Sequence, residues 1–193
     1  MYTPEVYQLH WPITGEDGQK KSAVTLHLIS HGEHAKAVAD EPDERTAFAR
    51  FAQLSCGLNE KEVQQLKVPD WNYLCQQLSS MVTKESAYFF AKLDTAYEPD
   101  IPQLLLPILG DNGQTISSIQ LTMPTVATTD VMLAQTDDEQ KSRFITASCS
   151  GLSPSELDRL SAPDWNALQG RIHDFLHKTA DYFRPQILSN SPM

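Results

Sequence analysis

The chain has 193 residues, a hydrophobic content of 40% and a formal net charge of −10, and both of its halves are acidic. At roughly 150 residues per domain, this length fits one ordinary domain or two small ones. The apolar content is sufficient for a buried core, and the acidic balance opposes binding to nucleic acid or to anionic membranes. We therefore expect a folded protein that has neither nucleic acid nor a membrane as a partner.

The sequence also predicts a location and a redox state. The first residues lack a basic segment followed by an apolar run, and the longest apolar run, Leu104–Leu109, contains a proline. Neither a signal peptide nor a membrane-spanning helix is therefore predicted. The cysteines form no C-x-x-C pair, which argues against a disulfide framework and a zinc site. We expect a cytoplasmic protein with three free thiols, Cys56, Cys75 and Cys149.

A repeat runs through the chain. The tetrapeptide Pro-Asp-Trp-Asn at 69–72 recurs 94 positions later at 163–166. Upstream, Pro12 aligns with Pro107 at an offset of 95. A shared register over this length indicates two copies of one module. The offset of 94 also aligns Gly57 with Gly151, Glu62 with Glu156, Leu66 with Leu160, Leu74 with Leu168, and Tyr88-Phe89 with Tyr182-Phe183.

The repeat sets the predicted domain boundaries. We expect a first module at residues 6–91, a linker at 92–101, a second module of the same fold at 102–185 and a C-terminal tail at 186–193. The linker is polar and contains a proline, as is typical of a boundary between modules.

Each copy opens with a predicted β-hairpin. The turns are Gly15–Gly18 and Gly110–Gly113, and apolar and polar side chains alternate after each turn. Alternation with a period of two beside a Gly-bearing turn is typical of a hairpin. The Asn112-Gly113 pair suits the positive φ angles of a tight turn. The alternating apolar positions are Val24, Leu26 and Leu28 in the first copy, and Ile119, Leu121 and Met123 in the second.

Helical periodicity follows each hairpin. An amphipathic pattern over Glu44–Ser55 corresponds to a weaker one over Glu139–Cys149. A short helix then begins at a capping box and ends near Leu66 or Leu160, and a second capped start leads into the Pro-Asp-Trp-Asn segment. The fold predicted is therefore α+β, with two similar small modules, each a β-hairpin followed by about three or four helices. The capping pairs are Asn59 with Glu62 and Ser153 with Glu156.

Candidate chemical sites do not recur between the copies. His173 and His177 have the spacing of two metal ligands on one helical face, but the aligned positions hold serine and threonine. His31 and His34 align with valine and threonine, and we expect a role at a helix N-terminus for that segment. Cys149 lacks the strand-nucleophile-helix elbow of a hydrolase. We predict no catalytic, cofactor-binding or metal-binding residue.

The acidic clusters recur, at Asp40–Glu44 and Asp137–Glu139. Neither cluster has the alternating oxygen ligands and glycine of a calcium loop. Acidic residues ahead of a helix stabilise its positive end, so we predict a structural role for both clusters.

Aromatic residues also recur. We expect Trp71 and Trp165 to anchor the two cores. The aromatic residues at the end of each module can either cap the core or contact a partner. These candidate partner-binding residues are Tyr88, Phe89, Phe90, Tyr182 and Phe183.

The second copy resembles a known family. The pattern consists of Leu121–Val126, an acidic helix, Gly151–Pro154, Glu156-Leu157 and Pro163–Leu168. It is similar to the small tail assembly chaperones of contractile-tailed bacteriophages of the Mu-like type, here present as a tandem duplication. The first copy lacks the Pro-Thr pair of this pattern and has other residues at that position.

The resemblance implies a non-enzymatic chaperone that binds the tape measure protein and keeps it soluble until tail tube subunits polymerise around it. The implied location is the cytoplasm of the bacterial host. The tail tube protein is a second possible partner, homo-oligomers are possible, and no cofactor is implied. Two alternatives stay open: a structural component of a phage tail or other assembly, and an enzyme with a metal at His173 and His177.

Overall fold

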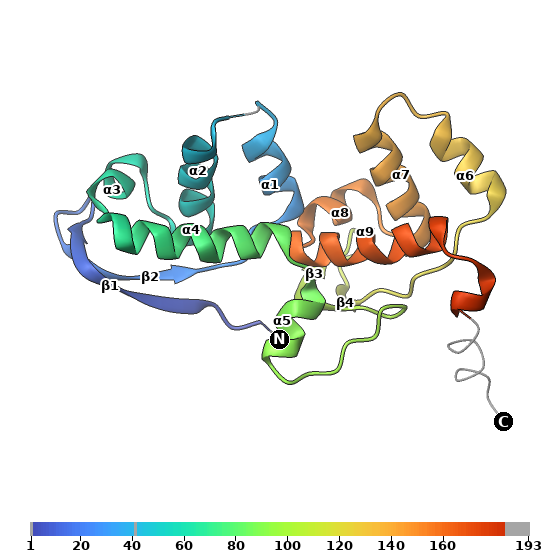
Figure 1. Ribbon diagram of the computed structural model, residues 1–193, viewed down its shortest axis with the longest axis horizontal. Helices are drawn as coiled ribbons and strands as arrows, with labels where there is room; N and C mark the ends of the chain where they lie inside the picture. Colours follow the sequence, from blue (N-terminus) through green and yellow to red (C-terminus); the bar gives the residue numbers. More distant parts are fainter. Residues whose placement is uncertain (1, 41, 184–193) are drawn as a thin grey trace.

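The computed structural model describes residues 2–40 and 42–183, so the expected tail at 186–193 lies outside the described residues. Two modules follow one another along the long axis of the molecule (Figure 1). The first contains β1 (Glu5–Thr14), β2 (Lys20–Leu26), α1 (His31–Val38), α2 (Glu44–Cys56), α3 (Glu60–Gln65), α4 (Val68–Thr83) and α5 (Ser86–Lys92). The second contains β3 (Gln103–Leu109), β4 (Thr115–Ser118), α6 (Val126–Leu133), α7 (Asp138–Ser150), α8 (Pro154–Arg159) and α9 (Ala162–His177).

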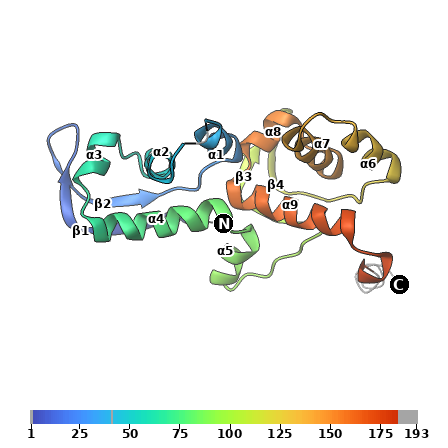
Figure 2. The same ribbon diagram turned by 45° about the horizontal axis from the view of Figure 1, so that its top comes forward.

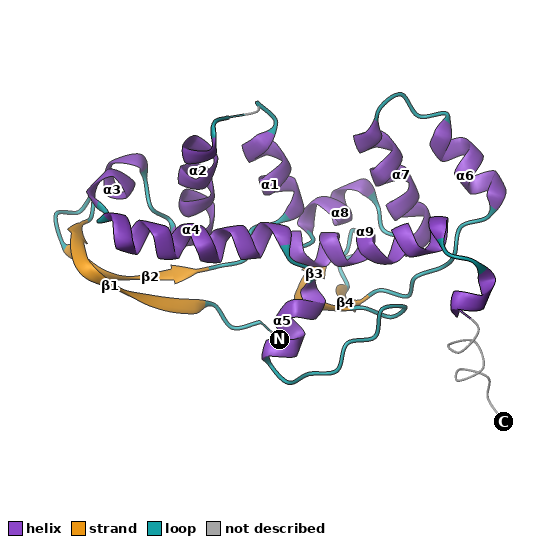
Figure 3. Cartoon of the chain, viewed as in Figure 1, coloured by secondary structure: helices purple, strands orange, loops and turns teal. Residues whose placement is uncertain are grey.

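The predicted α+β fold of two similar modules is confirmed. Helices α7, α8 and α9 have the same lengths as α2, α3 and α4 and begin 94 residues later. Each module pairs its two strands into a separate antiparallel hairpin. Two views show α4 and α9 following one another along the long axis, and Figure 3 shows each hairpin on the opposite side of this axis from the paired helices α1–α2 and α6–α7 (Figures 1, 2 and 3).

The hairpins differ from the prediction in two details. Strand β4 ends at Ser118, so the apolar alternation continues beyond the strand as extended chain; Ile119 and Leu121 are buried there, whereas Met123 is exposed. Asn112 also does not take a positive φ angle, and in its turn only Gly113 does, at 78°. A single left-handed residue after a type I turn is sufficient to reverse the chain, so the turn with two positive φ angles is not formed.

The predicted helix ends are confirmed, except at the start of α4, where the N-cap residue Lys67 makes no capping hydrogen bond with its side chain. Asn59 and Ser153 form capping boxes with the glutamates three residues later. The acidic clusters supply N-caps to α2 and α7, through Asp43 and Asp137. Both helices end at a left-handed glycine, Gly57 or Gly151, as expected of small residues closing a helix.

The two cores are joined by strand β3. Its side chains at Leu104 and Ile108 lie in the second core, whereas Leu105 is fully buried in the first. The Tyr2 amide donates a hydrogen bond of 3.2 Å to the Leu105 carbonyl. Because adjacent strand residues point to opposite faces, one short strand contributes to both modules and couples their stability.

The stretch expected as a linker, 92–101, packs against both modules. The ring of Tyr97 lies against Phe90 of the first module, with ring centroids 5.7 Å apart. The carboxylate of Asp100 accepts a hydrogen bond of 2.7 Å from Nε of Arg171 on α9. These contacts hold the connection at both ends, so it does not act as a flexible tether.

A buried aspartate at the start of the long helix holds the first strand of each module. Asp70 accepts hydrogen bonds from the backbone amides of His10 and Trp11 and from the Tyr7 hydroxyl. Asp164 accepts from the Leu105 amide at 3.0 Å. These two aspartates are the Asp of the repeated Pro-Asp-Trp-Asn segment, whose structural role the sequence alone did not reveal.

The same aspartate has opposite pKa shifts in the two modules. At Asp164, burial raises the pKa from 3.8 to about 6, despite hydrogen bonds from Ser161 and the Leu105 amide. At Asp70, hydrogen bonds from Tyr7 and the strand amides outweigh burial and lower the pKa. Both side chains are buried, and the difference lies in the balance: burial dominates at Asp164, whereas the hydrogen bonds from Tyr7, His10 and Trp11 dominate at Asp70.

Asp164→Asn and Asp70→Asn should therefore give opposite pH dependences of stability. The carboxyl of Asp164 binds its proton more tightly in the folded state, so its contribution is present near pH 4 and is lost as the pH rises through about 6. The stability advantage of the wild type over Asp164→Asn should fall by up to about 3 kcal/mol between pH 4 and pH 7. The stability advantage of the wild type over Asp70→Asn should stay constant between pH 4 and pH 7 and should decrease as the pH is lowered below 4. Urea unfolding at each pH measures both, and parallel profiles would contradict the assignment.

Candidate protein-binding surfaces

The N-terminus of α1 docks on the second module where α8 meets α9. The His31 amide donates a hydrogen bond of 2.6 Å to the Leu160 carbonyl, and the Ala162 amide donates one of 2.9 Å to the Ile29 carbonyl. The imidazole of His31 stacks on the indole of Trp165, with ring centroids 3.8 Å apart and 10° between the planes. Backbone pairing and ring stacking together fix the register of this junction.

A second contact caps the C-terminal end of α4. The side-chain amide of Asn166 donates hydrogen bonds of 3.0 Å and 3.2 Å to the carbonyls of Val82 and Lys84. The last carbonyls of a helix lack partners within the helix, so Asn166 satisfies them from the neighbouring module. The Trp-Asn half of the repeated tetrapeptide thus acts in the junction, in addition to the partial packing of Trp165 against the core.

The stacked histidine is held neutral. Burial lowers the pKa of His31 from 6.5 to about 4, and the nearby charge of Arg143 lowers it further. The prediction of a role at a helix N-terminus is confirmed, because His31 is the first residue of α1 after the Ser30 cap. Its contact with Trp165 could not be predicted from sequence, because 134 residues separate the two rings.

The corresponding face of the first module is open. A groove with a volume of about 630 Å³ lies there between α2, α3 and α4, and its lining includes Leu66, Val68, Trp71 and Asn72. Val68 is 68% exposed, whereas its counterpart Ala162 is 2% exposed beneath the first module. Trp71 packs partly against the first core, as expected, and its remaining surface lines the groove.

The candidate aromatic residues divide into buried and exposed members. Phe89, Phe90 and Phe183 are buried in the structure and serve packing. Tyr88 and Tyr182 are exposed by 38% and 47% of their surface, which leaves these two accessible to a partner.

Each exposed tyrosine has a lysine near the face of its ring. The Lys84 ammonium lies 5.9 Å from the ring centroid of Tyr88, and the Lys178 ammonium lies 5.6 Å from that of Tyr182. The two pairs are related by the offset of 94 residues. Such cation–π contacts hold an aromatic ring in place at modest energy. Tyr88 has a second, closer lysine, with the Lys92 ammonium 4.5 Å from its ring centroid, whereas the Tyr182 hydroxyl donates a hydrogen bond to Asp174.

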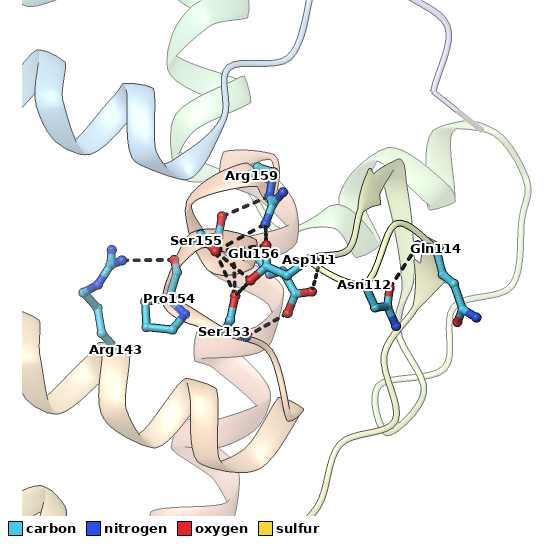
Figure 4. A network of polar contacts seen from close by, with 9 residues as sticks. All are labelled: Asp111, Asn112, Gln114, Arg143, Ser153, Pro154, Ser155, Glu156 and Arg159. Carbon is cyan, nitrogen blue, oxygen red and sulfur yellow. Dashed lines mark hydrogen bonds and ion pairs between the residues drawn. The ribbon is translucent and has the colours of Figure 1, made fainter.

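A polar network around Asp111 joins the second hairpin to α8 (Figure 4). The Asp111 carboxylate accepts hydrogen bonds from Ser153 and Ser155 and pairs with the Arg159 guanidinium. The Asp111 amide in turn donates a bond of 2.8 Å to Glu156. The hydrogen bonds from Ser153, Arg159 and Ser155 lower the pKa of Asp111 to about 2. The network has internal partners throughout, and we assign it to anchoring the hairpin.

The histidines and cysteines considered for chemistry lie apart from any larger cluster. The rings of His173 and His177 stack with their centroids 4.1 Å apart on α9. Within residues 2–40 and 42–183, no group of three or more His, Cys, Asp or Glu side chains is placed to hold a metal ion. Burial raises the pKa of the Cys149 thiol to about 11, which disfavours the reactive thiolate. The three cysteines are free thiols.

Comparison with known protein families finds a match in the second module. Residues 102–177, from the start of β3 to the end of α9, match the family of phage tail assembly chaperone proteins described as E, or 41 or 14. The second module is therefore similar to the phage tail assembly chaperones. The match supports a chaperone role in tail assembly, through interaction with phage tail proteins. No curated protein and no solved structure matches the chain.

The resemblance seen in the sequence and the family match fall in the same part of the chain, because the matched range lies within the second copy. In the described part of the chain, no helix is long and apolar enough to cross a membrane.

The neutral state of His31 gives a testable pH dependence. Because its folded pKa lies below 6.5, its contribution to stability is present above that pH and is lost as the pH falls towards 4. His31→Phe keeps a ring on Trp165 but cannot titrate. The stability of the wild type relative to this variant should fall by about 2 kcal/mol between pH 7 and pH 4, allowing for partial exposure of the ring.

Urea unfolding of both proteins, together with an NMR titration of the His31 ring, provides the measurement. A His31 pKa near 6.5 in the folded wild type would show that the stack on Trp165 does not form.

Proposed function

We propose that this protein is a non-enzymatic tail assembly chaperone that binds the tape measure protein and keeps it soluble in the cytoplasm of the bacterial host. The observation that carries the proposal is the family match over residues 102–177, which spans the second module from its first strand to its last long helix.

The physical character of the molecule supports this role. A long helical client presents apolar stripes that aggregate when they are left uncovered. A chaperone for such a client needs some apolar and aromatic surface for contact, and enough net charge to keep the complex in solution. The net charge of −10 meets the second need, and the exposed aromatic and aliphatic side chains of both modules supply the first.

We further propose that both modules derive from one duplicated Mu-like unit and that both contact the client. The support is the repeated order of elements at a nearly constant offset of 94 residues. Because the junction holds the modules together, each module can make one weak contact with an elongated client, and the two contacts lie at a fixed separation. Linked contacts of this kind raise overall affinity without any new interaction.

Tyr88 and Tyr182 are the client contacts that we propose. They are the exposed members of the aromatic set, they occupy equivalent positions in the two modules, and a lysine lies near each ring. Tyrosine supplies a large apolar face with a polar end, which suits a helical client with mixed surfaces.

Co-expression with the tape measure protein of the same phage tests the function. We expect the tape measure protein to be insoluble alone, and to be soluble and to co-elute with this protein on size exclusion when both are present. A tape measure protein that stays insoluble, with no co-elution, would overturn the proposal. Abundance of this protein in purified virions would instead favour a structural role.

The double variant Tyr88→Ala and Tyr182→Ala tests the proposed contacts. Truncating two aromatic contacts should weaken capture of the tape measure protein by about tenfold or more. Leu109→Ala is the matched control, because Leu109 is also exposed but lies at the end of β3. If the double variant and the control capture the client equally well, the contact lies elsewhere on the molecule.

A further inference from the structure

The two surfaces that form the interface between the modules each have an equivalent in the other module that is not occupied. Within the molecule, α1 of the first module docks on the α8–α9 junction of the second. The first module has its own α3–α4 junction, and the second module has its own counterpart of α1, which is α6. Both of these equivalent surfaces are exposed in the single chain.

The receiving surface is the groove of the first module. Four residues of the second module contact α1 and the end of α4. The positions equivalent to them in the first module, 94 residues earlier, line the groove and are Leu66, Val68, Trp71 and Asn72. Three of the four are identical between the modules, and the fourth exchanges alanine for valine. The groove therefore retains an indole face, a side-chain amide and the backbone positions that make the internal junction.

The inserting surface is the N-terminus of α6. Thr125 caps this helix as Ser30 caps α1, and Val126 takes the place of His31. Val126 is 78% exposed, and α6 buries none of its residues, whereas α1 buries Gly32 and Ala37. Met132, in the last turn of α6, packs partly against the second core, whereas the apolar N-terminal residue Val126 has no such contact and has unmet packing.

We propose that the occupant of the groove is the α6 N-terminus of a second copy of this chain. By equivalence with the internal junction, the Val126 amide would donate to the Leu66 carbonyl, and the Val126 side chain would pack on Trp71. The side chain of Asn72 would cap the C-terminal end of α9 of the second copy, as Asn166 caps α4. Continuity with the existing interface identifies the partner, because the two exposed surfaces are the missing halves of one contact.

The contact between copies is weaker than the internal one. Gly32 lies so close to α8 that an added Cβ would come within 2.9 Å of the Asp158 Cβ. The equivalent residue of α6 is Ala127, which must instead be accommodated by Gln64, an exposed and flexible residue of the groove. The contact also lacks the stack of imidazole on indole. We therefore expect reversible, concentration-dependent association.

The geometry determines the form of the assembly. The two surfaces lie on different modules, so the contact is heterologous, and a contact of this kind propagates head to tail until it closes or is capped. Each added copy continues the alternation of first and second modules, which extends the row of equivalent tyrosines. The inference does not depend on the client, because it concerns contacts of this chain with itself.

Sedimentation velocity of the full chain over a range of concentrations is the first test. The wild type should shift from monomer to a series of larger species as its concentration rises towards about 1 mM, the range of weak contacts. Val68→Glu should abolish the receiving surface and Val126→Glu the inserting surface, since a buried unpaired carboxylate is costly. Each variant alone should therefore remain a monomer.

Mixing the two variants distinguishes this arrangement from other dimers. The Val68→Glu chain keeps an intact α6, and the Val126→Glu chain keeps an intact groove, so an equimolar mixture should form a one-to-one dimer that grows no further. Leu54→Glu is the matched control, because Leu54 is an exposed aliphatic residue on α2 outside the groove lining; it should associate like the wild type. All the substituted positions are exposed, so folding should be retained, which circular dichroism checks.

Three outcomes would overturn the inference. The wild type could remain a monomer throughout the concentration range. The single variants could associate as the wild type does, which would place the contact elsewhere. The mixture could remain monomeric, which would show that the two surfaces do not bind each other. Loss of self-association with client binding unchanged would confirm this inference separately from the proposed function.

Discussion

The architecture depends on one buried carboxylate in each module. A hairpin of two strands is marginally stable by itself, and here Asp70 or Asp164, at the start of a long helix, accepts hydrogen bonds from the backbone of the first strand. The carboxyl group therefore fixes the strand to the helix, and the cores form around that pair of elements. The pKa of this carboxyl group depends on its surroundings: burial raises the pKa of Asp164, whereas hydrogen bonds lower that of Asp70.

The junction between modules is the second organising feature, and it is asymmetric. The second module uses its α8–α9 surface to hold the first, so that its Trp and Asn are engaged, whereas the same residues of the first module line an open groove. This asymmetry is a necessary result of joining two similar units head to tail, because one surface of each kind stays unused.

Internal repetition allowed much of the fold to be predicted. The hairpins, the capping boxes and the glycines that end α2 and α7 are determined by short segments of sequence, and all are present. The exposure of the aromatic candidates was less predictable, because it depends on which face of the short helix packs against the core; Phe89 and Phe90 are buried, whereas Tyr88 is exposed. The shared role of β3 was not visible either, since it depends on which module faces each side of the strand.

The sequence by itself determined what local interactions control, namely the order of hairpin and helices in each module, most of their caps and turns, and the acidic charge; within the described residues, the first module has five helices, one more than the predicted three or four. The family match lies within the copy that carried the resemblance in sequence. Only the tertiary structure decided how the modules meet, that His31 reaches Trp165, and that Trp71 is left facing a groove. The reason is physical: capping and alternation act over a few residues, whereas the exposure of a side chain depends on segments distant in sequence that fold against it.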